Sequence, residues 1–212
     1  MKDIQNILLA GVGGQGIVSL GHLILQSAIN SGYKVKGAET HGLSQRGGTV
    51  VFHARIGDVM GPLISKGEAD FLISLELAET ARYIEYLKPN GTLIMSTRTI
   101  YPNILQIINK KYPKLEEIYD VVSKRAKTVY VIPTESMALE IGSARAENLI
   151  LLGALIKLNP IFDYGIVEDA VAKRWPKAKE VNLKALKAGY EYLEKSGGAT
   201  LSHVLDKKEK TM

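Results

Sequence analysis

Short apolar runs alternate with helix-like patterns along most of the chain. Runs rich in branched aliphatic residues predict strands at residues 4–10, 33–39, 49–56, 69–75, 92–96 and 129–132. Apolar positions with helical spacing predict helices at residues 17–29 and 76–87, and interrupted helices between residues 101 and 127. This alternation predicts an α/β fold: a three-layer α/β/α, Rossmann-like domain with a mostly parallel sheet.

The C-terminal part has helical patterns without strands. Helices are predicted at residues 136–141, 146–158, 164–173 and 181–195, with breaks at Pro160 and Pro176. The segment 146–158 is apolar nearly all round, so it should be buried against the sheet or another subunit. The adjoining residues 145–148 either line a pocket or cap this helix. Residues 1–197 are predicted to form a single domain, and the charged residues 198–212 a disordered tail.

Composition narrows the class of protein. With 212 residues and 46% hydrophobic content, the chain can bury a substantial core. The net charge of +5 comes from lysines spread along the chain, and aromatic residues do not interleave with them as a single-strand nucleic-acid platform requires. Neither a signal-peptide pattern nor an apolar run of membrane-spanning length is evident. We therefore expect a cytoplasmic protein that binds neither nucleic acid nor membranes.

Cysteine and histidine usage limits the metal and redox chemistry of the chain. The sequence has no cysteine, which excludes disulfides, a cysteine nucleophile and thiolate-ligated zinc or iron–sulfur centres on this polypeptide. The histidines are scattered without metal-ligand spacing; they are His22, His41, His53 and His203. No metal site is therefore predicted.

A glycine-rich turn separates the first predicted strand from the first predicted helix. Gly11, Gly13 and Gly16 match the G-x-G-x-x-G pattern in the strand–turn–helix context that dinucleotide binding requires. Glu39 ends the second predicted strand, where a ribose-binding carboxylate would stand. Two interpretations stay open: a cofactor site, or a tight turn that binds no nucleotide.

A second glycine-rich segment, residues 37–50, includes the end of the second predicted strand, the loop at residues 40–48 and the start of the third predicted strand. Arg46 could bind an anion through two parallel hydrogen bonds. The neutral hydrogen-bonding side chains near it are His41, Ser44 and Gln45. Backbone N–H groups could complete an anion-receiving concavity at Gly42, Gly47 and Gly48. This inventory predicts a binding loop and not a plain connector.

Three other enzyme-like patterns are weaker. The turn has the glycine spacing of a Walker A motif, but Ile17 and Val18 stand where a P-loop needs lysine and serine or threonine. Ser44 lacks the second glycine of a G-x-S-x-G motif, which argues against a serine hydrolase. Glu76 and Glu79 could be catalytic carboxylates, but the favoured interpretation is that they stabilise a helix N-terminus through its dipole.

Together, the two glycine segments resemble those of one enzyme family. The first is Gly11-Val-Gly-Gly-Gln-Gly-Ile17, and the second is Glu39-Thr-His-Gly-Leu-Ser-Gln-Arg-Gly-Gly48. In combination they resemble the gamma-type subunit of 2-oxoacid:ferredoxin oxidoreductases over most of residues 3–195, closest to the small (beta) subunits of the indolepyruvate branch. The resemblance implies a complex that oxidatively decarboxylates 2-oxoacids (aryl pyruvate, indolepyruvate) with coenzyme A, giving acyl-CoA, carbon dioxide and reduced ferredoxin.

The resemblance also implies that the work is divided between chains. Thiamine diphosphate, magnesium and iron–sulfur clusters are expected on a larger alpha subunit, in a heterodimer or its multiple. This chain has no cysteine, and its Gly57-Asp58 is followed by Val59, so the thiamine motif G-D-G is missing. The resemblance therefore implies that this chain is not active alone and interacts with ferredoxin only through the complex. No catalytic residue is assigned to it.

Both glycine segments are expected to contribute to coenzyme A access and to the interface with the thiamine-bearing subunit. The expected cofactor-binding set is Gly11, Gly13, Gly14, Gln15, Gly16, Thr40, His41, Ser44, Gln45, Arg46, Gly47 and Gly48. Arg46 would bind a phosphate or a partner carboxylate. Two alternatives stay open: a stand-alone NAD-binding oxidoreductase that uses Glu39, and a non-catalytic assembly subunit whose loops serve only association.

Overall fold

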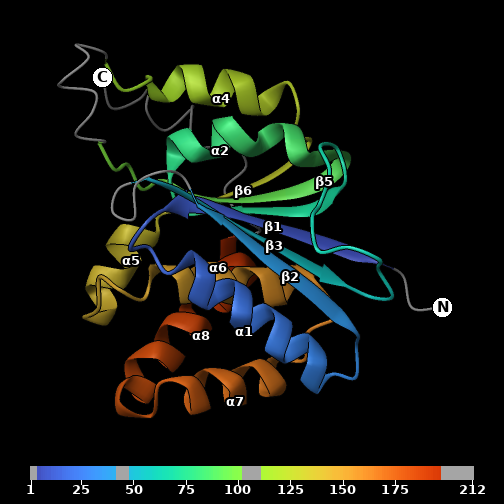
Figure 1. Cartoon of the computed structure of the whole chain (residues 1–212). Helices are drawn as coiled ribbons and strands as arrows, with labels where there is room; N and C mark the ends of the chain where they lie inside the picture. Colours follow the sequence, from blue (N-terminus) through green and yellow to red (C-terminus); the bar gives the residue numbers. More distant parts are fainter. Residues whose placement is uncertain (1–3, 42–47, 102–110, 197–212) are drawn as a thin grey trace.

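A six-stranded sheet forms the centre of the molecule (Figure 1). The computed structural model describes residues 4–41, 48–101 and 111–196. The strands are β1 (Gln5–Val12), β2 (Val35–His41), β3 (Thr49–Ile56), β4 (Ala69–Ser74), β5 (Leu87–Ser96) and β6 (Thr128–Ile132), in the spatial order β2-β3-β1-β4-β5-β6. β3 runs antiparallel to both neighbours, whereas β1, β4, β5 and β6 pair in parallel. The predicted α/β fold with a mostly parallel sheet is confirmed.

Helices cover both faces of the sheet. They are α1 (Ile17–Asn30), α2 (Leu77–Tyr83), α4 (Leu115–Ser123), α5 (Thr134–Ile141), α6 (Glu147–Leu158), α7 (Tyr164–Arg174) and α8 (Lys179–Ser196), with short 3₁₀ helices η1 (Ile84–Tyr86) and η2 (Pro176–Ala178). Figure 1 shows α2 and α4 above the sheet, and α1 and α5 to α8 below it. Successive β1 residues alternate between two cores, Ile7 and Leu9 in one and Leu8 and Ala10 in the other. Burial on both faces explains why this strand is a continuous apolar run.

The apolar helix α6 is buried within this chain. Its residues 148–156 are all buried, and it contacts both β5 and α8. Two glycines bring the backbones of α6 and α8 together. A Cβ added at Gly153 of α6 would lie 2.0 Å from the Leu186 oxygen, and one at Gly189 of α8 would lie 1.8 Å from the Ile150 oxygen. The all-round apolar pattern is therefore explained by the sheet on one side and α8 on another.

Most predicted bounds lie within two residues of the observed ones, and the differences have local causes. The second strand begins at Val35 and not at residue 33, because the Tyr33 N–H bonds to the Ala28 oxygen (3.0 Å) and completes the end of α1. The helix predicted at residues 76–87 was too long, since α2 gives way to η1, and Leu87 already begins β5.

The strand predicted at residues 92–96 was too short. β5 begins at Leu87 and includes Pro89, Asn90 and Gly91. Gly91 lets the chain pass close to β4, because a Cβ there would lie 2.9 Å from the Ala69 oxygen. The register between β4 and β5 shifts at this point. The irregular segment is therefore part of the strand.

Some predicted features lie outside the described residues. They are Ser44, Gln45, Arg46 and Gly47, part of the helical segment between residues 101 and 127, and the tail at residues 198–212. Beyond Pro113, the predicted helix is present as α4. Among the described segments, none of the helices combines the length and apolar character needed to cross a membrane.

Candidate functional site

The two glycine segments meet at the carboxyl edge of the sheet. The first forms the turn between β1 and α1, and the second ends at Gly48, directly before β3. The backbone N–H of Gly13 donates to the Gly48 oxygen at 2.9 Å. Because β1 and β3 are antiparallel neighbours, Val12 at the end of β1 pairs with Thr49 at the start of β3. Segments distant in the sequence thus form one edge.

The Gln15 side chain is engaged inside the first turn. Its Oε1 accepts the Val12 N–H at 2.8 Å, and its Nε2 donates to the Leu75 oxygen at 2.7 Å. Leu75 directly follows β4, so this amide links the ends of two parallel strands. To bind a ligand, the Gln15 amide would have to give up one or both of these hydrogen bonds to the backbone.

Replacing Gln15 with alanine should lower the free energy of unfolding of the isolated chain by about 2 kcal/mol, because two backbone groups lose their partner. Gln26→Ala is the matched control, since Gln26 is exposed and bonds to Asn30 on the surface of α1. Urea unfolding of both variants measures the difference. Equal stabilities would show that the Gln15 amide contributes nothing to the fold.

Gly16 ends the turn and caps α1. Its φ of 78° lies in the left-handed region that favours glycine. Asn148, near the start of α6, donates to the Gly16 oxygen at 3.4 Å, and a Cβ added at Gly16 would lie 2.5 Å from the Asn148 amide nitrogen. The last glycine of the pattern therefore lets α6 approach the turn. Asn148 is a site residue whose role the sequence pattern left undecided, because it reaches the turn only through the tertiary fold.

A pocket of about 530 Å³ opens beside the turn. Its lining residues are Val12, Gly13, Gly14, Gly16, Ile17, Val18, Ser19, His41 and Val50. Among the described residues, no side chain caps the N-terminus of α1, and its first turn holds no acidic residue, so the first-turn N–H groups and the helix dipole favour an anion here. Gly14 has a φ of 100°, and open space surrounds the position of a Cβ. Backbone donors can therefore approach a phosphate-sized anion closely.

Glu39 does not stand where a dinucleotide-binding fold needs its acidic residue. In such folds the carboxylate follows the strand beside the glycine-bearing strand. Here β3 takes that place, and β2 lies at the edge of the sheet. The Glu39 Oε1 lies 3.2 Å from Nε2 of His41 on the same strand. This arrangement argues against the stand-alone NAD-binding alternative.

Glu76 is a buried N-cap that joins three segments. It is 1% exposed, and its Oε2 accepts the Glu79 N–H at 3.0 Å in the first turn of α2. Its Oε1 accepts the Ile100 N–H at 3.1 Å and the Tyr112 hydroxyl. The Tyr112 hydroxyl in turn accepts the Ala78 N–H at 2.9 Å. The favoured interpretation, stabilisation of the helix N-terminus, is confirmed for Glu76, and the carboxylate also clamps α2 to the segments after β5 and before α4.

Glu79 places a second buried carboxyl group beside the start of β3. It is 6% exposed, and among the described residues its Oε2 has no hydrogen-bond partner. Its Oε1 lies 3.5 Å from the Arg82 Nε. Burial raises the pKa of Glu79, while Arg82 and a hydrogen bond with Thr49 oppose the rise. Folding therefore makes the Glu79 carboxyl a weaker acid than it is in the unfolded chain.

The raised pKa makes Glu79 a source of pH-dependent stability. Because the folded pKa exceeds the ordinary value of 4.5, the contribution of Glu79 to stability is fully present below that value and is lost as pH rises through the folded pKa. Glu79→Gln should therefore be more stable than the unmodified chain at alkaline pH and lose less stability between acidic and alkaline pH. Urea unfolding across pH measures this, with exposed Glu140→Gln on α5 as the control. A pH dependence identical to that of the unmodified chain would contradict the assignment.

Another buried polar group braces the carboxyl ends of β5 and β6. The hydroxyl oxygens of Ser96 and Thr134 lie 2.6 Å apart, and Thr134 donates to the Glu147 Oε2 at 2.7 Å. Arg98 forms an ion pair with Glu135. The hydroxyl contacts hold α5 and α6 against the sheet. The ion pair with Glu135 neutralises the charge of Arg98.

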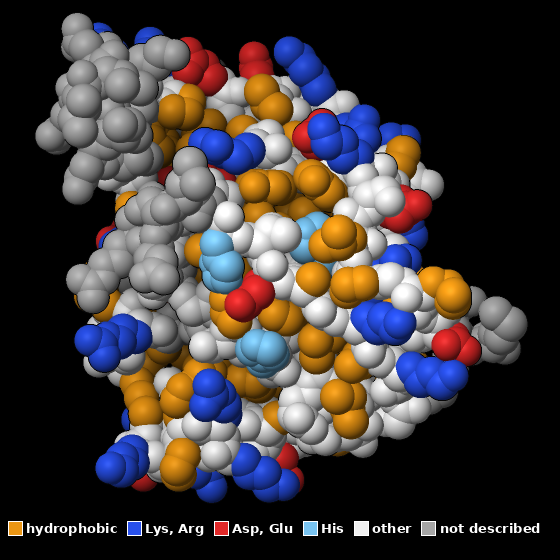
Figure 2. Space-filling model, in the orientation of Figure 1, with side chains coloured by type: hydrophobic (Ala, Val, Ile, Leu, Met, Phe, Trp, Pro, Cys, Tyr) orange, Lys and Arg blue, Asp and Glu red, His pale blue; other side chains and the backbone are white. Residues whose placement is uncertain are grey.

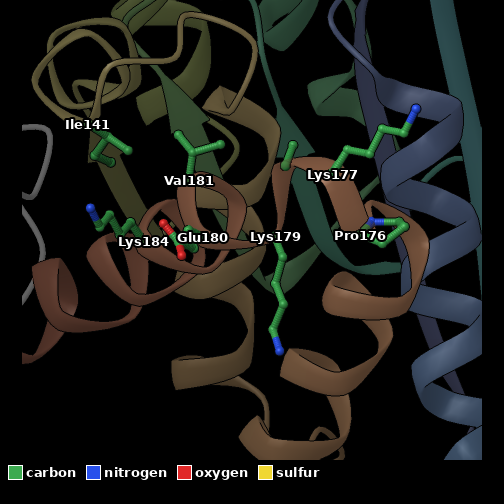
Figure 3. Close-up of a pocket in the computed structure, with 8 residues that line it drawn as sticks. Ile141, Pro176, Lys177, Lys179, Glu180, Val181 and Lys184 are labelled. Carbon is green, nitrogen blue, oxygen red and sulfur yellow. The ribbon is translucent and has the colours of Figure 1, made fainter.

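A second hollow, of about 450 Å³, lies at the start of α8 (Figure 3). Its lysines do not converge, since Lys177 and Lys179 extend away from each other, and Lys184 lies beside Glu180. The described charged side chains that line this hollow therefore do not point to a common ligand position. Nor do three histidine, aspartate or glutamate side chains come together for a metal ion anywhere in the described segments.

Known proteins share the sequence pattern of this chain. The pattern of the pyruvate ferredoxin/flavodoxin oxidoreductase family matches residues 6–192. Indolepyruvate oxidoreductase subunit IorB of Archaeoglobus fulgidus is 41% identical over 188 residues, which cover 87% of this chain and 93% of that protein. Ketoisovalerate oxidoreductase subunit VorA of Methanothermobacter marburgensis is 25% identical over 90% of this chain, but over 37% of its own length.

A solved structure shares the fold. The 2-oxoglutarate:ferredoxin oxidoreductase from Magnetococcus marinus, determined with 2-oxoglutarate, coenzyme A and succinyl-CoA bound, gives a TM-score of 0.70 at 21% identity. The match covers 90% of this chain and 31% of that chain. The resemblance inferred from the two glycine segments is confirmed by the family pattern and by the indolepyruvate relative. The chain belongs to the pyruvate ferredoxin/flavodoxin oxidoreductase family.

Proposed function

We propose that this chain is the small, gamma-type subunit of a 2-oxoacid:ferredoxin oxidoreductase that works with a larger subunit in the cytoplasm. Its family membership and its identity to an indolepyruvate oxidoreductase subunit support an aryl pyruvate, such as indolepyruvate, as the 2-oxoacid. The complex releases carbon dioxide from the 2-oxoacid, joins the acyl group to the coenzyme A thiol and passes the electron pair to ferredoxin.

The observation that carries this chain's share of the work is the hydrogen bond between Gly13 and Gly48 beside the open N-terminus of α1. Coenzyme A carries phosphate groups, and the free first-turn N–H groups of α1 can bind one of them. The open space at Gly14 leaves room for the ligand to approach the backbone. Arg46 stands two residues before Gly48 in the sequence, so we assign its guanidinium to a coenzyme A phosphate or to a partner carboxylate at the same edge.

We place thiamine diphosphate, magnesium and the iron–sulfur clusters on the larger subunit. The sequence has no cysteine to ligate a cluster. Gly57-Asp58-Val59 departs from the thiamine motif and follows the end of β3 at the edge opposite the glycine turn. The residues of this chain therefore do not fit these groups, and we assign it to coenzyme A access and assembly.

The decisive experiment reconstitutes the chain with its larger subunit and follows ferredoxin reduction by indolepyruvate with and without coenzyme A. Arg46→Ala should raise the coenzyme A KM by about tenfold, because a charge-assisted hydrogen bond is lost, or should impair assembly. Arg174→Ala, exposed at the end of α7, is the matched control. If Arg46→Ala leaves both assembly and the KM unchanged, the role given to Arg46 is wrong. If the wild-type complex reduces no ferredoxin with any 2-oxoacid, the proposed function is wrong.

A further inference from the structure

The loop between β3 and β4 exposes two large apolar side chains. Met60 is 97% exposed and Leu63 is 56% exposed, although their neighbours Val59 and Ile64 are buried. The hydrophobic effect disfavours leaving such side chains in water. Isolated exposed apolar residues are common, but neighbouring ones on a loop that is otherwise anchored in the core mark a contact surface.

Cationic side chains from the adjoining strands hold the backbone of this loop. Arg55 Nη1 lies 3.1 Å from each of the Gly61 and Leu63 oxygens, to which it donates. Lys36 donates to the Met60 oxygen at 2.7 Å. The loop backbone is thus ordered before any partner binds, and association loses little further chain entropy.

The loop lies over β2 and β3 on the face of the sheet that carries α2 and α4, where none of the described helices covers these two strands. On this face α2 contacts β1, β4 and β5 and carries α4 outside it, whereas β2 and β3 extend beyond these helices (Figure 1). On β2, Lys36 is exposed beside the loop, and Thr40 is exposed farther along the strand, opposite Val51. Figure 2 shows hydrophobic side chains at the surface over this region. In the described part of the chain the helix layer therefore stops short of β2 and β3, and an apolar surface lies there.

The chain lengths of relatives point to one occupant. In the ketoisovalerate subunit VorA the matched region is 37% of the protein, and in the 2-oxoglutarate enzyme it is 31% of the chain. The greater part of each longer chain lies outside this fold and must be accommodated around it. For this chain, the corresponding part would be a separate polypeptide, and the two chains would need a non-covalent interface to associate.

We propose that Met60 and Leu63 anchor this chain to an apolar hollow on the larger subunit of its oxidoreductase, a proposal that rests on the proposed function. The unbranched thioether of Met60 can fill an irregular hollow, and methionine is enriched at interfaces of this kind. Leu63 widens the apolar contact, and the exposed polar residues of β2 form its rim.

Methionine oxidation tests the contact without any substitution. In the isolated chain, dilute hydrogen peroxide should oxidise Met60 and spare Met95, which is fully buried. In the purified complex with the larger subunit, oxidation of Met60 should slow toward the rate of Met95, as measured by peptide mass spectrometry. Undiminished oxidation of Met60 in the complex overturns the proposal. So does protection of Met60 already in the isolated chain, because another segment or a second copy then covers it.

Substitution gives an independent readout. Met60→Asp should weaken binding of the larger subunit at least about tenfold, because a carboxylate would enter an apolar contact. Leu139→Asp is the matched control, since Leu139 is 63% exposed on α5, on the opposite face of the sheet. Both variants should keep the wild-type Tm, and titration calorimetry compares their affinities. Wild-type affinity in Met60→Asp, in a complex that still reduces ferredoxin, overturns this inference alone. Failure of the wild-type and Leu139→Asp chains to bind a larger subunit overturns the proposed function as well.

Discussion

Replacing Gly189 with alanine is expected to lower the free energy of unfolding by about 3 kcal/mol. The added Cβ would lie 1.8 Å from the Ile150 oxygen and 2.6 Å from its carbonyl carbon, so backbone atoms of α6 obstruct it. Backbone cannot turn aside as a flexible side chain can, and the two helices must separate. Helix propensity alone predicts the opposite sign, since alanine favours a helix interior by about 1 kcal/mol over glycine. The sign of the change in urea unfolding therefore decides between the two effects.

The control for this substitution is Gly61→Ala, where a Cβ meets no atom within 4 Å. Its stability should stay near that of the unmodified chain. The double substitution Gly153→Ala with Gly189→Ala should cost less than the sum of the single ones, because the first already forces α6 and α8 apart. A stabilising effect of Gly189→Ala would show that the helices do not meet through their backbones.

Glu76→Ala should also cost about 3 kcal/mol, since it leaves buried donors without an acceptor. The carboxylate accepts bonds from the N–H groups of Glu79 and Ile100 and from the Tyr112 hydroxyl, and it caps α2. Loss of the cap and of the clamp should loosen α2 and the segments on both sides of it together. Urea unfolding measures the total loss, and hydrogen exchange at Ile100 reports whether the clamp has opened.

Two further variants separate the contributions to this effect. Tyr112→Phe removes the hydroxyl, which donates to Glu76 and accepts the Ala78 N–H, and should cost about 2 kcal/mol while leaving the Glu76 bonds to the Glu79 and Ile100 N–H groups in place. Glu140→Ala, at an exposed position of α5, should cost little and controls for the loss of a helix carboxylate. If Glu76→Ala is as stable as Glu140→Ala, the buried carboxylate does not hold these segments.

Sequence patterns predicted where strands and helices lie along the chain better than which strands lie side by side in the sheet. β3 was predicted at its observed bounds because its branched residues and flanking glycines are local signals. Its place between β1 and β2 was not predicted, since strand order depends on tertiary pairing. That insertion moved Glu39 off the strand beside the glycine turn and weakened the NAD-binding interpretation.

The same limit applies to the candidate site. The glycine spacing predicted the turn after β1, and its contact with Gly48 follows from the antiparallel pairing of β1 with β3. The side chains that complete the site act across the fold: Gln15 bonds to Leu75, and Asn148 bonds to Gly16. No local pattern marks such partners. The coenzyme A assignment itself stays a prediction, because it depends on a ligand and in part on Arg46.

The bond from Asn148 to Gly16 spans 132 positions, and that from Asn159 to Gln5 spans 154. A ribosome must therefore synthesise most of this polypeptide before its first turn and first strand acquire their last partners. Until α6 and α8 emerge, the core cluster that contains Ile7 and Leu9 lacks the side chains that these two helices contribute to it. Nascent chains of intermediate length thus expose apolar surface on an incompletely covered sheet. Chaperones recognise such surface, and it promotes aggregation. For the same reason, the C-terminal helices cannot be removed to obtain a smaller working glycine-turn unit.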